Sequence, residues 1–600
     1  MTDSRITDSR PTDSRPTDSR LTAESRSSAL QQLTESTQPG KQLDVLVIGG
    51  GITGAGVALD AVTRGLSTAV VEAQDWGAGT SSRSSKLVHG GLRYLQMLDF
   101  KLVREALTER DLLLKTIAPH LVRPIPFLYP LRHRVWERAF VGAGILLYDT
   151  LASLSSGKRS VPWHRHLTRT QVLRAFPGLA PKAAVGAIEY WDASVDDARF
   201  VVTAIRTAQE AGALAAARTQ VVEITKDASG TVDGALLVDL ETGTTFPVKA
   251  RSVISSTGVW TEESQALAGD TGGLRVLASK GIHIVVSRDA IAGEPGLILQ
   301  TDKSVLFVIP WSRYWVIGTT DTPWNEDLLN PTATAADIDY VLGQANSVLA
   351  TPLKRSDVIG TWAGLRPLLQ PGTKAGTTSA KVSREHTVAS PVPGLTVIAG
   401  GKLTTYRVMG KDAVNFALGD EARLRPSVTA SLPLIGADDA QAAAVELAVH
   451  AKRFGWDARL TDHLMHRYGA NVRDIVAMCE ADPAMAQVIG GAGAYLRAEV
   501  LYAITHEGAL HLDDIMMRRT RIVYEFVNEG AAALDEIAAI AASALEWTPE
   551  QTAHETAVYR TRSEAEAQAA LQSDDASAAD IREAVDEIVP WRNPESLSKR

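Results

Sequence analysis

The hydrophobic pattern near the start of the chain predicts one supersecondary unit. An apolar run that ends at Ile48 is followed by a glycine cluster at 49–54, a helix-like stretch with small residues on its inner side, and a second run rich in apolar residues at 68–71. A strand, a glycine turn, a helix and a second strand within about thirty residues are typical of a βαβ unit with parallel strands. The sequence therefore predicts an α/β domain that begins close to residue 41.

Further short runs rich in β-branched residues alternate with helical patterns as far as residue 420. They cover 250–258, 281–288, 304–311, 314–321 and 395–401. Because these runs lie far apart in the sequence, we interpret them as one nucleotide-binding domain interrupted by a second, antiparallel-rich domain. From residue 436 to 570 the pattern becomes alanine-rich with interleaved charges, which indicates a separate helical C-terminal domain.

Both ends of the chain are predicted to lack structure. The first residues repeat Thr-Asp-Ser-Arg four times and contain no apolar core, so they form neither a signal peptide nor a helix. We expect residues 1–40 to be a disordered tail, and residues 571–600, which are rich in Glu, Ala and Asp, to fray.

The composition narrows the classes of function. The chain has 600 residues and a net charge of −9, and its Lys and Arg are scattered, which argues against a nucleic-acid partner. Cys479 is the single cysteine, so neither an intramolecular disulfide nor a cysteine-built metal site is expected. The His and Asp spacings show no convincing ligand face, and we predict no metal. No window reaches the roughly 18 apolar residues of a membrane-spanning helix, so any membrane contact would be peripheral.

The glycine cluster has the spacing of a dinucleotide-binding turn. Gly49 permits the tight turn, Gly51 lets a pyrophosphate approach the backbone, and Gly54 lets the helix pack closely on the strand. Glu72 stands at the end of the second strand, where a carboxylate can accept hydrogen bonds from ribose hydroxyls and disfavours the 2′-phosphate of NADP. A glycine-rich turn without a ligand is the weaker alternative.

The segment after the second strand favours FAD over NAD. The stretch "DWGAGTSSRSSKLVHGG" brings serine and threonine hydroxyls together with Arg83 and Lys86. Hydroxyls and backbone N–H groups at the start of a helix suit a second approach to phosphate and to the polar edge of a flavin. Taken alone, Ser81 or Ser82 capping an ordinary surface helix would explain the same residues.

Motifs in a fixed order then identify a family. The chain resembles the FAD-dependent, aerobic, quinone-linked glycerol-3-phosphate dehydrogenases from residue 43 to about residue 530. The motifs are "VIGGGITGAG", "TSSRSSKLVHGGLRYL", "VDDARFV", "KGIHIVV", "FVIPW", "IGTTDTPW", "GLRPL" and "GGKLTTYR". The resemblance implies oxidation of glycerol 3-phosphate to dihydroxyacetone phosphate at the cytoplasmic membrane surface, with electrons passed to a quinone.

The resemblance also implies a fold class and a division of the chain. We expect an α/β protein with a Rossmann-like FAD domain of the glutathione-reductase-like, or DAO, type, an inserted antiparallel substrate-binding cap and an α-helical C-terminal domain. The expected parts are the FAD domain at 41–118, 190–265 and 362–420, the cap at 119–189 and 266–361, and the helical domain at 430–570.

The family's functional positions fall on motif residues of this chain. By resemblance the substrate-binding residues are Arg93, Tyr94, Arg366 and Lys402, and a phosphate dianion suits their permanent charges. The expected cofactor-binding residues are Gly49, Gly51, Gly54, Glu72, Thr80, Ser81, Ser85, Lys86, Gly258, Gly401, Lys402, Leu403 and Thr404. The chain has Ser255 and Ser256 where the family usually has Asn-Ala, and we expect FAD binding to survive this change.

Histidine is the side chain suited to removing the C2 hydroxyl proton near neutral pH. His89 and His283 occupy the family's two histidine positions, and the sequence does not rank them. Arg366 is the third expected catalytic residue, since its charge can stabilise a developing alkoxide.

A quinone acceptor requires contact with a bilayer. The stretch from Arg132 mixes arginines with Trp136, Phe140, Leu146 and Leu147, which suits a monotopic membrane face, although a buried cap helix is an equally good interpretation. We expect a cytoplasmic protein associated peripherally with the inner face of the cell membrane, and a homodimer is left open. An oxygen-reducing glycerol-3-phosphate oxidase, an amine oxidase on the same scaffold and a non-catalytic nucleotide-binding protein are the alternatives.

Overall fold

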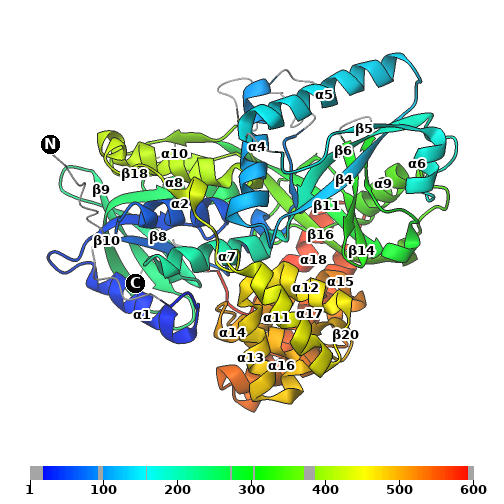
Figure 1. Cartoon of the computed structure of the whole chain (residues 1–600). Coiled ribbons are helices and arrows are strands. Elements are labelled where there is room, and N and C mark those ends of the chain that lie inside the picture. Colours follow the sequence, from blue (N-terminus) through cyan, green and yellow to red (C-terminus); the bar gives the residue numbers. More distant parts are fainter. Residues whose placement is uncertain are drawn as a thin grey trace, which may run out of the picture.

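A computed structural model describes residues 18–91, 99–156, 159–269, 273–301, 305–370 and 385–591. Figure 1 shows two sheet-based regions side by side, with a helical domain below them. One sheet is mainly parallel and the other mainly antiparallel. The predicted class, an α/β fold with an antiparallel insertion and a helical C-terminal domain, is therefore confirmed.

The first sheet forms the nucleotide-binding domain. Its central strands β18, β10, β1, β2 and β7 pair in parallel, and the β8–β9 hairpin joins it through β10. The strand bounds are β1 Leu43–Ile48, β2 Thr68–Val71, β7 Leu214–Ala216, β8 Thr219–Lys226, β9 Val232–Asp239, β10 Thr245–Ser255, β17 Thr387–Ala389 and β18 Leu395–Ala399. Buried parallel strands read as apolar runs, and the sequence predicted β1, β2, β10 and β18 from such runs but not β7, β8, β9 or β17.

Helices cover one face of this sheet. α2 (Ile52–Thr63) packs between α7 (Asp197–Glu210) and α10 (Tyr406–Leu418), and nearly all of its residues are buried. A Cβ on Gly410 would lie 2.5 Å from the carbonyl carbon of Gly56, so only glycine lets α2 and α10 approach this closely.

The other face of the first sheet is covered in part by a helix that was not predicted. α1 (Ala23–Glu35) begins at a capping box in which Thr22 and Ser25 bond reciprocally, and Leu33 is fully buried against the sheet. Arg26 also pairs with Asp239, at 2.5 Å. The prediction of a disordered tail is therefore wrong for 23–35, and residues 1–17 lie outside the described part.

The second sheet forms the cap. Its order is β15-β11-β14-β13-β12-β4-β6-β3, with β16 paired to β11 and β5 to β6. The bounds are β3 Leu87–Val88, β4 Arg123–Leu131, β5 Arg165–Thr168, β6 Gly186–Ser194, β11 Val276–Ser287, β12 Gly296–Gln300, β13 Val305–Trp311, β14 Tyr314–Gly318, β15 Thr322–Pro323 and β16 Val358–Leu369. The predicted cap boundaries at 189 and 361 fall inside β6 and β16, so both were placed too early.

Further helices build the cap and the C-terminal domain. Those associated with the cap are α4 Phe100–Leu112, α5 Trp136–Ser156, α6 Arg169–Ala175 and α9 Ala335–Asn346. α8 (Thr261–Ala266) instead contacts β18 of the first sheet. Those of the C-terminal domain are α11 Ala440–Phe454, α12 Ala458–Tyr468, α13 Val472–Ala481, α14 Arg497–Thr505, α15 Ile522–Glu525, α16 Leu534–Leu545, α17 Pro549–Ala569 and α18 Asp575–Glu583. A short hairpin of β19 (Val488–Ile489) and β20 (Ala492–Leu496) interrupts them.

The end of the chain is ordered further than predicted. α18 packs on α17, and its Arg582 is buried between Glu566, at 3.2 Å, and Glu587, at 2.5 Å. The described residues then continue as far as Trp591. The prediction that residues 571–600 fray is therefore wrong up to 591, and 592–600 lie outside the described part.

Buried ion pairs join the C-terminal domain to the nucleotide-binding domain. Arg519 binds Asp75, which follows β2, with nitrogen–oxygen distances of 2.5 and 2.6 Å. Arg521 donates to Asp196 and, at 2.5 Å, to Asp197 at the start of α7. Because removing one partner strands a buried charge, these pairs fix how the domains meet.

Candidate active site

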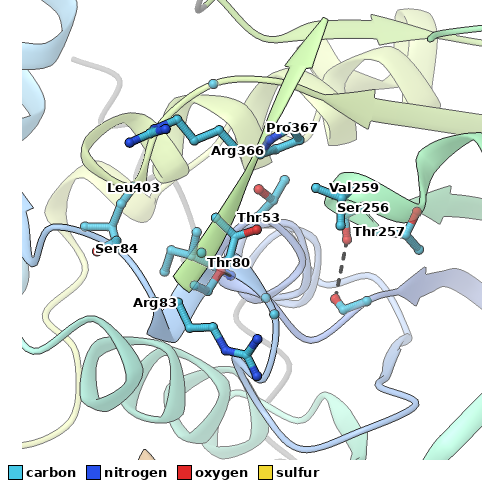
Figure 2. A pocket seen from close by; sticks show the side chains of 18 of the residues that line it. Thr53, Thr80, Arg83, Ser84, Ser256, Thr257, Val259, Arg366, Pro367 and Leu403 are labelled. Atoms are coloured by element: carbon cyan, nitrogen blue, oxygen red, sulfur yellow. Dashed lines mark hydrogen bonds between the residues drawn. The ribbon is translucent and has the colours of Figure 1, made fainter. Parts of the chain in front are cut away.

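One large cavity opens at the carboxyl ends of the parallel strands, where ligands bind in open α/β sheets. Its volume is about 910 Å³, and it is lined by the β1–α2 turn, the loop 79–91, the segment 256–267, strands β11 and β16, and residues 400–404. Figure 2 shows its wall, with Arg366 on the β16 strand and Thr80 and Ser84 on the loop facing it. Residues from the nucleotide-binding domain and the cap therefore meet in a single space.

The β1–α2 turn forms a cradle that side chains would fill. Gly49 has φ +105°, and a Cβ on Gly54 would lie only 1.8 Å from the carbonyl oxygen of Gly49. Gly49 and Gly51 line the cavity, whereas Gly54 packs behind them and supports the turn. The start of α2 thus borders the cavity with glycine backbone, which lets a pyrophosphate approach closely.

Glu72 stands at the end of β2 and lines the cavity, as predicted. Its carboxylate accepts hydrogen bonds from the N–H groups of Gly50, at 2.6 Å, and Gln74, at 2.8 Å. Each carboxylate oxygen keeps further acceptor capacity, so ribose hydroxyls can still bind.

The hydroxyl-rich loop forms the cavity wall beside the glycine turn. Thr80, Ser81 and Ser85 line the cavity, and Ser81 Oγ accepts a hydrogen bond from the N–H of Ile52, at 2.9 Å. The cradle, Glu72 and these hydroxyls fit FAD, because they offer donors to both phosphates and an acceptor to a ribose.

The prediction that Lys86 binds the cofactor is wrong, because Lys86 does not line the cavity. Its ammonium is buried, lies 2.7 Å from Asp197 Oδ1, and stands 4.7 Å from the centre of the Trp362 ring. Burial lowers the pKa of Lys86 to about 8. Lys86 therefore holds the loop in place rather than contacting a cofactor.

The remaining predicted cofactor residues line the cavity. They are Gly258, Gly401, Lys402, Leu403 and Thr404. Gly258 and Gly401 both have positive φ, at +60° and +81°. Ser256 takes the family's alanine position, and its hydroxyl donates to the carbonyl of Ile48, at 2.9 Å, so the unusual residue closes the junction between β1 and β10.

The predicted catalytic residues gather at the cap end. His89, His283, Arg366 and Lys402 all line the cavity. Predicted residues Arg93 and Tyr94 lie outside the described residues. The structure thus brings together every predicted substrate and catalytic residue that it describes.

The surroundings of His283 favour its neutral form. Its Nε2 lies 2.8 Å from the Ser85 hydroxyl, and its ring stacks on Trp362 at a centroid distance of 5.1 Å. Burial, together with the nearby charges of Arg366 and Lys86, holds the pKa of His283 well below its usual value.

Arg366 is fixed by its neighbours. Its Nη2 donates to the Thr319 hydroxyl, at 3.0 Å, and to the Thr320 carbonyl, at 3.1 Å. A Cβ on Gly281 would lie 2.3 Å from the same nitrogen, so the glycine of "KGIHIVV" makes room for the guanidinium. No signal in the sequence pattern alone linked Gly281 to Arg366.

Sequence reasoning missed the residues that position the loop. Asp197 accepts from the N–H and the hydroxyl of Ser84, at 3.0 and 2.7 Å, and from Lys86 and Arg521. The motif "VDDARFV" contained a signal for this role. It places two adjacent carboxylates at a helix start, where one is enough for the N-cap, so the second is free to bind another group.

A second missed group lies beside His89. Tyr148 of α5 accepts from the N–H of Gly90, at 2.8 Å, and donates to Asp192, at 2.6 Å, which also binds Arg110 at 3.0 Å. Burial raises the pKa of Asp192, and Arg110 opposes this shift. This buried network fixes the backbone next to His89 and ties it to α5.

Within the described residues, no group of three or more His, Cys, Asp or Glu side chains is arranged to hold a metal ion. The chemistry available in the cavity is that of histidines, fixed cations and a dinucleotide cradle.

Comparison with known proteins identifies the family. The model described as "FAD dependent oxidoreductase" matches residues 44–407, and that described as "C-terminal domain of alpha-glycerophosphate oxidase" matches 427–552. Glycerol-3-phosphate dehydrogenase 2 of Mycobacterium tuberculosis is 49% identical over 544 residues, covering 90% of this chain and 92% of that protein. The human mitochondrial glycerol-3-phosphate dehydrogenase is 36% identical, covering 87% of this chain and 73% of that protein.

A solved structure is similar over nearly the whole chain. The glycerol-3-phosphate dehydrogenase of Bacillus halodurans, complexed with FAD, matches with a TM-score of 0.70 and 28% identity, covering 90% of this chain and 97% of that one. Its FAD agrees with the cradle, the hydroxyl-rich wall and Glu72 described above. The chain belongs to the FAD-dependent glycerol-3-phosphate dehydrogenase family.

Proposed function

We propose that this protein oxidises the C2 hydroxyl of sn-glycerol 3-phosphate to give dihydroxyacetone phosphate and passes the electrons to a membrane quinone. The observation that supports this proposal is that His89, His283, Arg366 and Lys402 share one cavity with the dinucleotide cradle. When bound, FAD supplies the acceptor for the hydride that leaves C2. The relatives at 49% and 36% identity carry names that specify the same substrate.

Two permanent cations suit a phosphorylated alcohol. Arg366 is held by Thr319 and Thr320, and Asp321 lies 3.6 Å from its other terminal nitrogen, so the guanidinium stands at a fixed position in the cavity. We assign Arg366 to the oxygen that becomes negative during oxidation, and Lys402 to the phosphate.

The two histidines differ in their capacity to accept a proton. A general base must hold the proton it has taken, and a pKa well below the working pH weakens that capacity. His283 is in that position, because burial and two neighbouring cations disfavour its charged form. We therefore assign proton removal to His89 and substrate orientation to His283.

The half-reaction provides the direct test. Anaerobic addition of glycerol 3-phosphate to the purified holoenzyme is expected to bleach the oxidised flavin band. The variant Arg366→Ala should need about 10- to 100-fold more substrate for half-maximal bleaching, because a hydrogen-bonded charge contact is lost.

Two controls make this result specific. The spectrum of bound FAD should be the same in Arg366→Ala and wild type, and Arg355→Ala, which removes an exposed arginine paired with Asp339, should bleach normally. A wild-type protein that stays yellow with glycerol 3-phosphate sinks the proposed activity, and normal kinetics in Arg366→Ala removes that residue from the site.

Oxygen is the alternative acceptor. Hydrogen peroxide released in proportion to glycerol 3-phosphate consumed would identify an oxidase, whereas reduction of a quinone analogue without peroxide supports the dehydrogenase.

The outer face of α5 supports contact with a bilayer. Figure 1 shows α5 at the top of the molecule, away from the C-terminal helices. Trp136 and Phe140 are 63% and 66% exposed, and Leu146 and Leu147 continue the same face. Exposed Arg132 and Arg134 precede the helix, where they can meet anionic head groups. No helix in the described ranges is long and apolar enough to cross a membrane.

The inner face of α5 supports a quinone acceptor. Ile145 and Tyr148 of α5 belong to the same apolar cluster as Tyr190, Ile298 and Phe307, which line the cavity. An acceptor dissolved in lipid would thus meet apolar side chains from the outer helix to the cavity wall.

Vesicle binding tests the membrane face. The double variant Phe140→Glu/Leu146→Glu should bind phosphatidylcholine vesicles containing phosphatidylglycerol at least on the order of tenfold more weakly than wild type. The reason is that two apolar side chains that would enter the bilayer are replaced by charged ones. Val449→Glu, which changes an exposed valine of α11, serves as the control. Equal co-sedimentation of the double variant and wild type would show that α5 is not the docking face.

A further inference from the structure

We propose that the segment 584–591, after α18, is a strap that forms part of the FAD site and slows the release of FAD, with Trp591 as its contact residue. The segment lies beyond residue 552, where the matched C-terminal domain ends. It nevertheless reaches the cavity, because Trp591 is one of the lining residues.

Trp591 lies at the dinucleotide end of the cavity. Its ring is stacked on that of Trp260, with a centroid distance of 6.2 Å and an angle of 21° between the ring planes. Trp260 in turn covers Gly79, since a Cβ built there would lie 3.2 Å from the Trp260 ring. Gly79 directly precedes Thr80 and Ser81, which face the glycine cradle. The two indoles therefore stand over the start of the hydroxyl-rich loop, at Gly79.

The strap is anchored to the cap and the C-terminal domain through Glu587. The Glu587 carboxylate accepts from Asn330 Nδ2, at 2.9 Å, and from Arg582 Nη2, at 2.5 Å. Arg562 also lies within 3.9 Å. The neighbouring arginines keep the pKa of Glu587 below its usual value, so the anchor stays ionised at neutral pH.

The strap also contacts the nucleotide-binding domain. Val589 packs on Val222, Val238 and Leu240 of the β8–β9 region. β8 begins with Thr219, Gln220 and Val221, which line the cavity. The segment therefore connects three domains around the end of the cavity that holds Glu72.

Trp591 is not locked in place. Its side chain is 40% exposed, and Trp260 is partly buried beneath it. A half-exposed aromatic stack can open without unfolding the core, yet it must be displaced before a ligand covered by it leaves. The expected consequence is a slower release of FAD, with no change in the chemistry at the cap end.

The release rate of FAD tests the proposal without substrate, so it is independent of the activity proposed above. Holoenzyme is diluted, and the return of free-flavin fluorescence is followed over time. Trp591→Ala should release FAD about 2- to 12-fold faster than wild type, which corresponds to the loss of one aromatic pair. Trp591→Phe, which keeps an aromatic ring, should restore most of the difference.

Two further variants guard against a general structural effect. Glu587→Gln weakens the anchor and leaves Trp591 intact, and it should also speed release. Trp163→Ala removes a similarly exposed tryptophan on the cap and should release FAD as wild type does. The proposal is overturned if Trp591→Ala and Glu587→Gln both release FAD at the wild-type rate, or if Trp163→Ala speeds release equally.

Discussion

Replacing His89 by asparagine is expected to slow the anaerobic reduction of FAD by glycerol 3-phosphate by about 10²- to 10⁴-fold, the usual contribution of a positioned proton acceptor. His89 lines the cavity, and its backbone N–H donates a hydrogen bond to Thr404 Oγ1, at 3.1 Å. The backbone can therefore keep its place when the ring is changed. Stopped-flow absorbance at saturating substrate measures the rate.

The corresponding change at His283 separates the two histidines. His283→Asn should lose about tenfold or less in the reduction rate, because His283 is bonded to Ser85 and poorly suited to hold a proton. His450→Asn, on α11 in the C-terminal domain, should react as wild type does. A larger loss for His283→Asn than for His89→Asn would reverse the assignment of the base.

The second large effect is expected at Asp197, which holds the hydroxyl-rich loop. Asp197→Asn should lower the free energy of unfolding by about 3–5 kcal/mol, because it leaves Lys86 and Arg521 as buried charges with a weakened partner. Urea unfolding of the apoprotein, and the FAD content of the purified variant, measure the loss.

The loss at Asp197 should depend on pH. Burial lowers the pKa of Lys86 to about 8, so the folded protein already disfavours the protonated lysine in the wild type. Removing the charge of Asp197 disfavours the protonated lysine further. A lysine whose folded pKa lies below its unfolded pKa weakens the fold at low pH and ceases to do so as it loses its proton. The cost of Asp197→Asn should therefore be smaller at about pH 9 than at about pH 7.

A surface pair provides the control. Asp535 pairs with Arg560 at 2.5 Å, but both side chains are exposed. Asp535→Asn should change stability by less than about 1 kcal/mol. If Asp197→Asn were no more costly than Asp535→Asn, the buried network would not position the loop.

The sequence by itself determined the elements whose residues carry a local signature. The parallel strands are buried on both faces and so read as apolar runs, and the glycines at 49, 51 and 54 are required by one turn. His89, His283, Arg366 and Lys402 were predicted because they lie in motifs that follow the order of a known family. The helix α1 could also have been found, since Thr22 and Ser25 form a capping box, but the preceding repeat suggested disorder over too long a stretch.

Only the tertiary structure decided which of these residues face the cavity. Lys86 lies in the same motif as Ser85, yet it turns to Asp197, more than a hundred residues away, because a buried ammonium needs a counter-ion. Trp591 lies beyond every motif, and its place at the cavity depends on α18, Glu587 and Val589 docking on three domains. Local sequence patterns determine the turns and the strands. Packing between distant segments determines which groups pair with buried charges and which residues line a cavity.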